Sequence, residues 1–158
     1  MLFRSDLLDC IVGARQYKRW RHDGSHRFRG RDPRIKTEVG RHDGQALVST
    51  GRAGYLSFGP FIDLAAGRWR VEVRGTGSPG SLRNCYIDCS AAGGAEVLWK
   101  RELATQPLDE SILFLHQFEL VRPARGFELR VHVSAGAEVR LDGIELTPES
   151  ELDRPKRG

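Results

Sequence analysis

Polar and aromatic side chains alternate with apolar ones along several short segments, and these are the residues that could do chemistry. Planar polar groups bond to sugar hydroxyls, and flat aromatic rings stack on the apolar faces of sugar rings. Successive side chains of an extended strand point to opposite faces, so the polar members of each segment face outward. The candidate ligand-binding residues are Arg70, Asn84, Tyr86, Asp88, Gln117, Arg130 and His132, with Trp99 as a further aromatic candidate.

Motifs of known catalytic sites are absent from the sequence. It contains no Gly-x-Ser-x-Gly turn, no phosphate-binding loop with Gly-Lys-Ser/Thr, no His-Glu-x-x-His and no Cys-x-x-Cys. Asp88, Glu119 and Asp142 are acids of the kind that cleave glycosides in pairs, but their neighbours in sequence are those of ordinary surface or turn acids. The sequence therefore favours a binding protein over an enzyme. A solvated sheet surface has the same composition as the candidate site and remains the alternative.

Composition is that of one folded domain. The chain has 158 residues, of which 39% are hydrophobic and 29% charged, which excludes a disordered chain. Its 25 basic and 21 acidic residues leave a net charge of +4, which allows an anionic partner without requiring one. No apolar run approaches the roughly 18 residues of a membrane span, and the first residues lack the apolar core of a secretory leader. We expect a cytoplasmic protein.

The elements that must position the candidate residues are strands. Residues 68–74 and 127–133 alternate strictly between apolar and charged or polar side chains, which is the period of a half-buried strand. About eight such segments follow one another at short spacing without a helical pattern between them, which predicts an all-β sandwich or barrel. Asp142-Gly143 interrupts the alternation of the last strand and predicts a β-bulge.

Three parts follow from this pattern: a basic N-terminal arm or short helix over 1–32, a β-sandwich over 33–148 and a charged tail over 149–158. Residues 15–31 combine arginines with aromatic side chains. Such an arm could dock on an acidic protein or on a second copy. Nucleic-acid binding is a weaker alternative, because the basic excess of the whole chain is small. The three cysteines are an odd number, which argues against a disulfide framework and favours buried thiols.

From residue 51 to 146 the order of features resembles the carbohydrate-binding modules of the galactose-binding-like jelly-roll class. The resemblance rests on residues 54–61 and 64–74, where an aromatic-rich strand is followed by a glycine turn and a Trp-x-Val strand. It also rests on 127–131 and 141–146, which are similar to the closing strand pair of that class. The resemblance implies a single jelly-roll β-sandwich of about eight antiparallel strands. It also implies non-catalytic binding of a glycan or polysaccharide, as in the modules that accompany bacterial polysaccharide and glycosyltransferase proteins.

Members of that class often hold a structural calcium ion where the first and last strands meet, and Glu38 and Asp142 are the matching acids in this sequence. Calcium takes six or more oxygen ligands, and these two side chains supply only part of such a set. The resemblance therefore implies either a structural calcium ion or no cofactor, in which case Asp142 only shapes the bulge.

Overall fold

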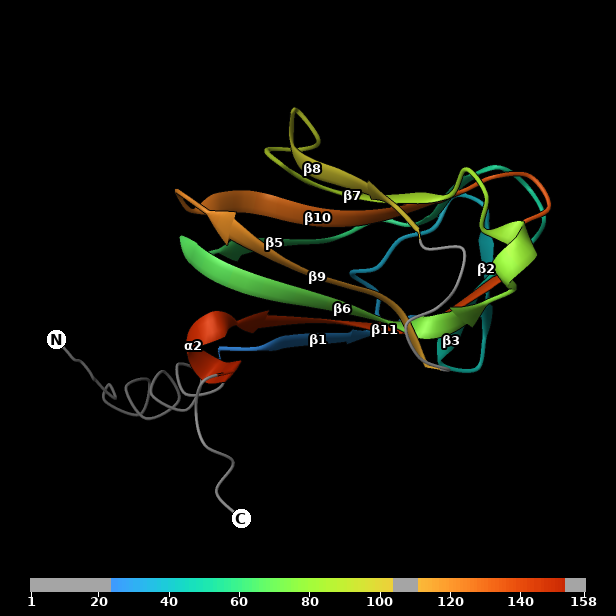
Figure 1. Ribbon diagram of the computed structural model, residues 1–158, viewed down its shortest axis with the longest axis horizontal. Coiled ribbons are helices and arrows are strands. Elements are labelled where there is room, and N and C mark those ends of the chain that lie inside the picture. The colour runs from blue at the N-terminus through green and yellow to red at the C-terminus, as the bar shows by residue number, and fades with distance from the viewer. Residues whose placement is uncertain (1–23, 104–110, 153–158) are drawn as a thin grey trace, which may run out of the picture.

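Two antiparallel sheets pack face to face in the computed structural model, which describes residues 24–103 and 111–152 (Figure 1). The six-stranded sheet has the order β2-β3-β11-β6-β9, and β1 also pairs with β11. The five-stranded sheet has the order β4-β10-β7-β8, and β5 also pairs with β10. These two layers confirm the predicted all-β jelly-roll sandwich, although the described part of the chain contains eleven strands rather than about eight.

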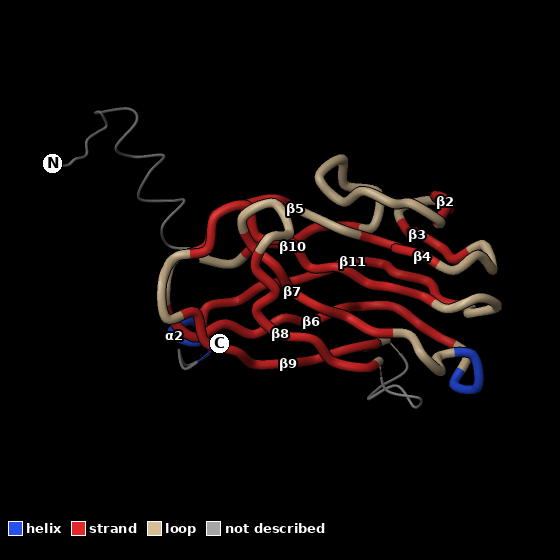
Figure 2. Tube along the Cα trace, turned by 90° about the horizontal axis from the view of Figure 1, so that it is seen from above, coloured by secondary structure: helices blue, strands red, loops and turns tan. Residues whose placement is uncertain are grey.

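The six-stranded sheet consists of β1 (His26–Arg29), β2 (Gly40–Asp43), β3 (Ala46–Ser49), β6 (Gly67–Gly77), β9 (Ile112–Leu120) and β11 (Val139–Pro148). The five-stranded sheet consists of β4 (Gly54–Ser57), β5 (Pro60–Leu64), β7 (Tyr86–Ala91), β8 (Glu96–Glu102) and β10 (Ala124–Val133). A 3₁₀ turn, η1 (Pro79–Ser81), precedes β7, and a short helix, α2 (Glu149–Leu152), follows β11. Figure 2 shows that most strands of both layers run along the long axis of the molecule.

The core lies between the two sheets and is made by the apolar residues of the predicted alternation. In β6, Val71 and Val73 are fully buried and Trp69 nearly so. In β10, Phe127 and Leu129 are fully buried. Each strand thus contributes one apolar face to the core and leaves its other face to the surface of the sandwich.

The predicted bulge is present in β11. Its register against β6 shifts between Leu141 and Gly143. A side chain at Gly143 would place its Cβ 2.8 Å from the carbonyl oxygen of Phe28, so the glycine lets β1 approach β11 closely. The bulge therefore lies where β1 joins the sheet.

The sandwich begins earlier than the predicted boundary at residue 33. β1 falls within the segment assigned to the arm, yet it pairs with β11 and places Phe28 in the core. The reason is that Phe28 alternates with Arg27 and Arg29, a half-buried strand too short to stand out in a basic segment. Residues 15–23 and Cys10 lie outside the described residues. Among the helices of the described part, none is long and apolar enough to cross a membrane.

The cysteines of β7 and the turn before it are structural. Cys85 and Cys89 are both buried and both free, as expected for thiols on one inward face. Burial raises the pKa of the Cys89 thiol well above its usual range, so this thiol stays protonated and unreactive.

Candidate ligand-binding site on the outer face of the five-stranded sheet

Strand register brings four of the predicted residues together on the outer face of the five-stranded sheet. Arg130 of β10 lies opposite Asp88 of β7, and His132 lies opposite Tyr86. On the other side of β10, His132 lies opposite Tyr55 of β4. The result is a polar face with aromatic side chains, set on three hydrogen-bonded strands rather than on loops.

The centre of this face is an ion pair with two parallel hydrogen bonds. Arg130 donates from Nε and Nη2 to the two carboxylate oxygens of Asp88, over 2.7 Å and 2.9 Å. The bond to Asp88 raises the pKa of Arg130, so the guanidinium stays charged. Asp88 is buried and Arg130 is half-buried, so the pair fixes the guanidinium in one orientation. Among the described residues, none takes a hydrogen bond from Nη1, which leaves this nitrogen as a donor for a ligand.

Tyr86 is held between two other side chains. The His132 ring stacks on it at 4.7 Å and 7°, and the Lys100 ammonium lies 4.0 Å from its ring centre. Burial raises the pKa of Tyr86 to about 12, and a hydrogen bond with Tyr55 adds to this shift. Because His132 and Lys100 both pack against its ring, Tyr86 is not the free stacking platform that the sequence suggested. It packs against His132 and forms a hydrogen bond with Tyr55.

A pocket of ≈ 450 Å³ opens beside this cluster, a size within the roughly 300–1,000 Å³ of small-ligand sites. Two aromatic rings, those of Tyr55 and Phe58, and three charged side chains, Glu38, Glu128 and Arg130, line it. The remaining lining residues are Thr37, Gly93 and Gly94. The pocket therefore combines apolar ring surfaces with planar groups that can form hydrogen bonds.

Glu128 supplies one of the two carboxyl groups of the pocket, the other being that of Glu38. Glu128 is buried, and desolvation raises its pKa, an effect that Arg130 opposes and Asp88 reinforces. No hydrogen bond from another described residue satisfies this carboxyl group. It can therefore accept hydrogen bonds from a ligand, and it sits on the same strand as the fixed guanidinium of Arg130.

The other predicted residues lie elsewhere. Arg70 and Gln117 are opposite each other on the six-stranded sheet, so they cannot share a ligand with Tyr86. Asn84 is exposed in the turn before β7. Trp99 points inward, opposite Cys89, and its ring lies 4.7 Å from His116. Alternation correctly separated outward from inward residues in β6, β7 and β10, but it does not reveal which sheet a strand joins.

Three lining residues were missed by the sequence reasoning although the sequence carried a signal for each. Glu128 belongs to the same alternating face as Arg130 and His132. Tyr55 and Phe58 lie in the aromatic-rich segment 54–61 that carried the resemblance. Lys100, which lies over the ring of Tyr86, had no such signal, because the strand that holds it has no clear alternation.

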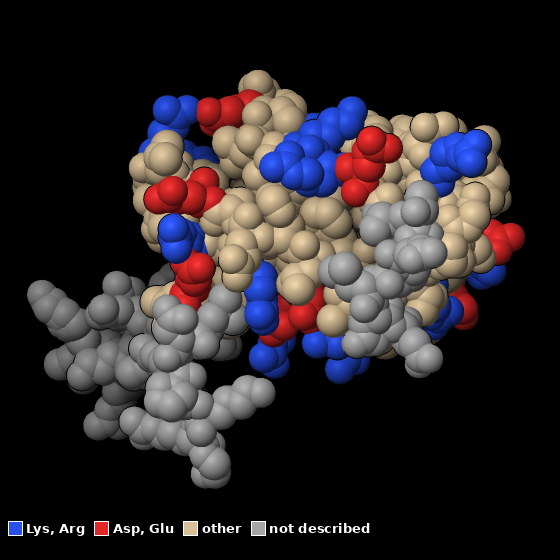
Figure 3. Space-filling view, in the orientation of Figure 1, with Lys and Arg blue, Asp and Glu red and all other residues tan. Residues whose placement is uncertain are grey.

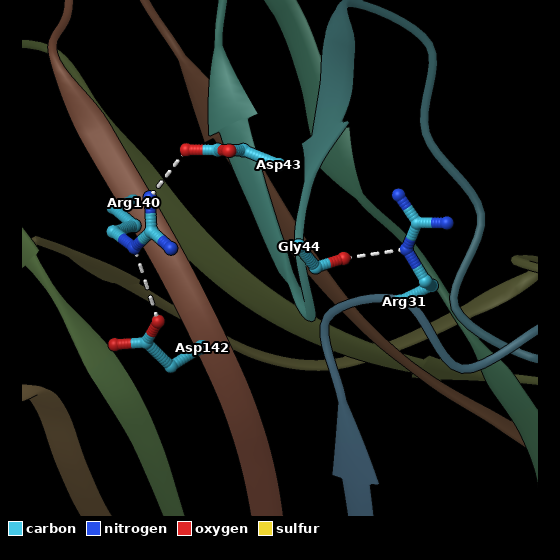
Figure 4. A network of polar contacts seen from close by, with 5 residues as sticks. All are labelled: Arg31, Asp43, Gly44, Arg140 and Asp142. Carbon is cyan, nitrogen blue, oxygen red and sulfur yellow. Dashed lines mark hydrogen bonds and ion pairs between the residues drawn. The ribbon is translucent and has the colours of Figure 1, made fainter.

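The two acids proposed for calcium are not brought together. Glu38 accepts a hydrogen bond from the backbone N–H of Tyr55 and lines the pocket on the five-stranded sheet. Asp142 bonds to Arg140 on the six-stranded sheet, and the same guanidinium also bonds to Asp43 (Figure 4). Among the described residues, no group of three His, Cys, Asp or Glu side chains could hold a metal ion.

A larger hollow of ≈ 1030 Å³ lies at one end of the sandwich. Residues of 48–51, 76–79 and 136–140 line it together with Arg41, and none of them is aromatic. It contains none of the predicted ligand-binding residues. Of these two, the smaller pocket is therefore the better candidate site, because it combines two aromatic rings with the predicted Arg130.

Comparison with known proteins finds relatives by fold only. No protein-family model and no curated protein matches the chain. The chain is similar in structure to the C-terminal family-6 carbohydrate-binding module (CBM6) of LamC, a marine laminarinase from Zobellia galactanivorans, with a TM-score of 0.52 and 11% identity over 78% of this chain and 98% of that one. A second similar structure is the CBM6 module of Cellvibrio mixtus lichenase 5A in complex with cellotriose, with a TM-score of 0.48 and 13% identity over 77% and 95% of the two chains.

The fold of this chain is thus the β-sandwich of carbohydrate-binding modules, as the resemblance in sequence implied. A shared fold does not by itself carry a shared function. The function has to be argued from the site.

Proposed function

We propose that this chain is a non-catalytic carbohydrate-binding module, accessory to bacterial polysaccharide synthesis or modification, and that its glycan binds in the pocket on the five-stranded sheet. The observation that carries the proposal is the lining of this pocket, where Tyr55 and Phe58 stand beside Glu128 and Arg130. The similarity in fold to the laminarinase module also supports a carbohydrate-binding function.

Each part of the pocket has a role in binding a sugar. The rings of Tyr55 and Phe58 offer apolar surface to the C–H face of a pyranose. The carboxyl group of Glu128 accepts hydrogen bonds from sugar hydroxyls, and Nη1 of Arg130 donates to a hydroxyl or ring oxygen. Because the guanidinium is already held by Asp88, little side-chain freedom is lost when the ligand binds.

The experiment is a glycan array followed by calorimetric titration of the best ligand. We expect saturable binding that Phe58→Ala weakens about tenfold, or ~1.4 kcal/mol, because the variant removes one stacking surface. Glu128→Gln should weaken it by at least a similar factor, because a charged acceptor becomes neutral. Val121→Ala is the matched control, since it trims an apolar side chain that is 86% exposed and lies outside the pocket.

Two results would contradict the proposal. One is the absence of binding to any glycan at near-millimolar protein concentration. The other is saturable binding that both pocket variants leave unchanged while their thermal unfolding matches that of the unmodified protein.

A further inference from the structure

Strand β9 forms one edge of the six-stranded sheet and pairs only with β6 among the described strands. The backbone groups on its other side have no strand partner in the described part of the chain. An exposed edge of this kind is a template for a further strand, because its free N–H and C=O groups can continue the sheet.

The other sheet edges in the described structure carry features that discourage pairing. β1 and β2 are four residues long and contain charged side chains, and β8 has four charged residues among seven. On the opposite side of the five-stranded sheet, β4 is only four residues long and β5 begins with Pro60 and contains Asp63. Short length, charge and proline are the usual protections of an edge strand.

β9 has none of these protections. It is nine residues long, contains no proline, and Glu119 is its single acidic or basic residue apart from His116. On its outer face Leu115 is 41% exposed, and on its inner face His116 and Phe118 are only half-buried. Figure 3 shows a broad area without charged atoms in the middle of this side of the molecule, bordered by charged side chains. The edge is therefore long, apolar and accessible.

We propose that β9 pairs antiparallel with β9 of a second copy of this chain, across a two-fold axis perpendicular to the sheet. This interface is separate from the proposed sugar pocket, which lies on the outer face of the five-stranded sheet. Pairing of the two β9 strands would join the six-stranded sheets of the two copies into one continuous sheet, in which each β9 edge is covered by the other.

The sequence of β9 is compatible with itself in this arrangement. The register centred on His116 gives β9 its longest self-pairing, and it places Phe114 of one copy opposite Phe118 of the other; the register shift of β9 against β6 lies at Leu113, near the start of the strand. Both side chains are on the inner face, so the pair adds an aromatic contact across the interface. Glu119 falls opposite Leu113, so no like charges meet.

The neighbouring edge strand does not have this property. When β8 is paired with itself over its full length, Glu96 of one copy lies opposite Glu102 of the other at both ends of the strand. Like charges directly opposite each other destabilise a strand pair. The absence of opposed like charges and the pairing of Phe114 with Phe118 thus favour β9 over β8, and a second copy of the same strand as its occupant.

The first test measures the mass of the full-length chain by sedimentation equilibrium from micromolar to near-millimolar concentration. We expect a monomer–dimer equilibrium. Leu115→Lys places a charge in the middle of the edge and should raise the dimer dissociation constant at least tenfold. Val121→Lys makes the same change just beyond the strand, at an exposed position, and should leave the constant unchanged.

The second test reads the register. In a chain with Cys10→Ser, His116→Cys should form a disulfide-linked dimer on mild oxidation, because the two-fold axis places residue 116 opposite itself. Glu119→Cys should not, because its opposite residue is Leu113. A chain that stays monomeric at every concentration would overturn the proposal. So would a dimer that Leu115→Lys does not weaken, since such a dimer would use another surface.

Discussion

His116 lies among aromatic rings at the open side of the sandwich. Its ring centre is 4.7 Å from that of Trp99, 5.9 Å from Phe114 and 6.4 Å from Phe118. Desolvation lowers the pKa of His116, and the charge of Arg101 lowers it further. The folded state therefore favours the neutral imidazole.

This shift makes stability depend on pH in a definite direction. The unfolded chain binds a proton at His116 more readily than the folded chain does, so the free energy of unfolding is at its full value above the unfolded pKa of about 6.5. It should fall as the pH drops below that value toward the folded pKa. His116→Gln should remove this part of the pH dependence of the free energy of unfolding. Urea unfolding checks this between about pH 7.5 and 5.5, roughly one unit on either side of the unfolded histidine pKa.

The same substitution at the exposed His42 serves as the control. Glu128 acts in the opposite sense, because its raised pKa means that stability falls as the pH rises above about 4.5. Glu128 is present in both His116→Gln and the unmodified chain, so the difference in pH dependence between these two chains reports the contribution of His116 alone. An identical slope in the unmodified chain and His116→Gln would contradict the assignment.

At the scale of elements, the close approach of β6 and β11 depends on Gly75. It lies opposite Leu141, and a Cβ at this position would collide with the carbonyl oxygen of Arg140. Gly75→Ala must push the two central strands of the six-stranded sheet apart and should lower the free energy of unfolding by about 2 kcal/mol.

Gly80 is the matched control. It lies in the 3₁₀ turn η1, where a Cβ would meet nothing within 4 Å. Gly80→Ala should change stability by less than about 0.5 kcal/mol. Equal effects of the two variants in chemical denaturation would show that the contact with Arg140 does not limit the spacing of these strands.

Element by element, the sequence predicts strand faces well and sheet membership poorly. The alternation of Trp69, Val71 and Val73 identifies an inward face because its period is set by the geometry of a strand. The bulge at Asp142-Gly143 is visible for the same reason, since it breaks that period. Arg70 and Gln117 were grouped with Tyr86 because nothing local in a sequence tells which strands become neighbours. Trp99 is a similar case, since a bulge between Cys89 and Ser90 in the pairing of β7 and β8 obscures the alternation there.

At the scale of the whole molecule, both sheets share one core and neither can bury its apolar face alone. Phe127 of the five-stranded sheet is fully buried and stacks on Phe118 of the six-stranded sheet, with ring centres 6.1 Å apart. We therefore expect the two sheets to unfold together in a single transition.

Phe127→Ala should lower the free energy of unfolding by about 3–5 kcal/mol, because it leaves a cavity between the sheets. Phe61→Ala is the control, since Phe61 is 45% exposed, and should cost much less. Urea unfolding followed by fluorescence and by circular dichroism gives both values. Two separate transitions, one for each sheet, would contradict a shared core.

The pocket is assembled from parts that differ in how freely they can change. Its floor comes from Glu128 and Arg130 of β10, whose neighbours in the strand fill the core, whereas one wall is the Gly93-Gly94 turn between β7 and β8. That turn contributes no side chain to the core. Insertions there can widen or narrow the site without disturbing the core, so ligand preference in this molecule can change largely independently of core packing.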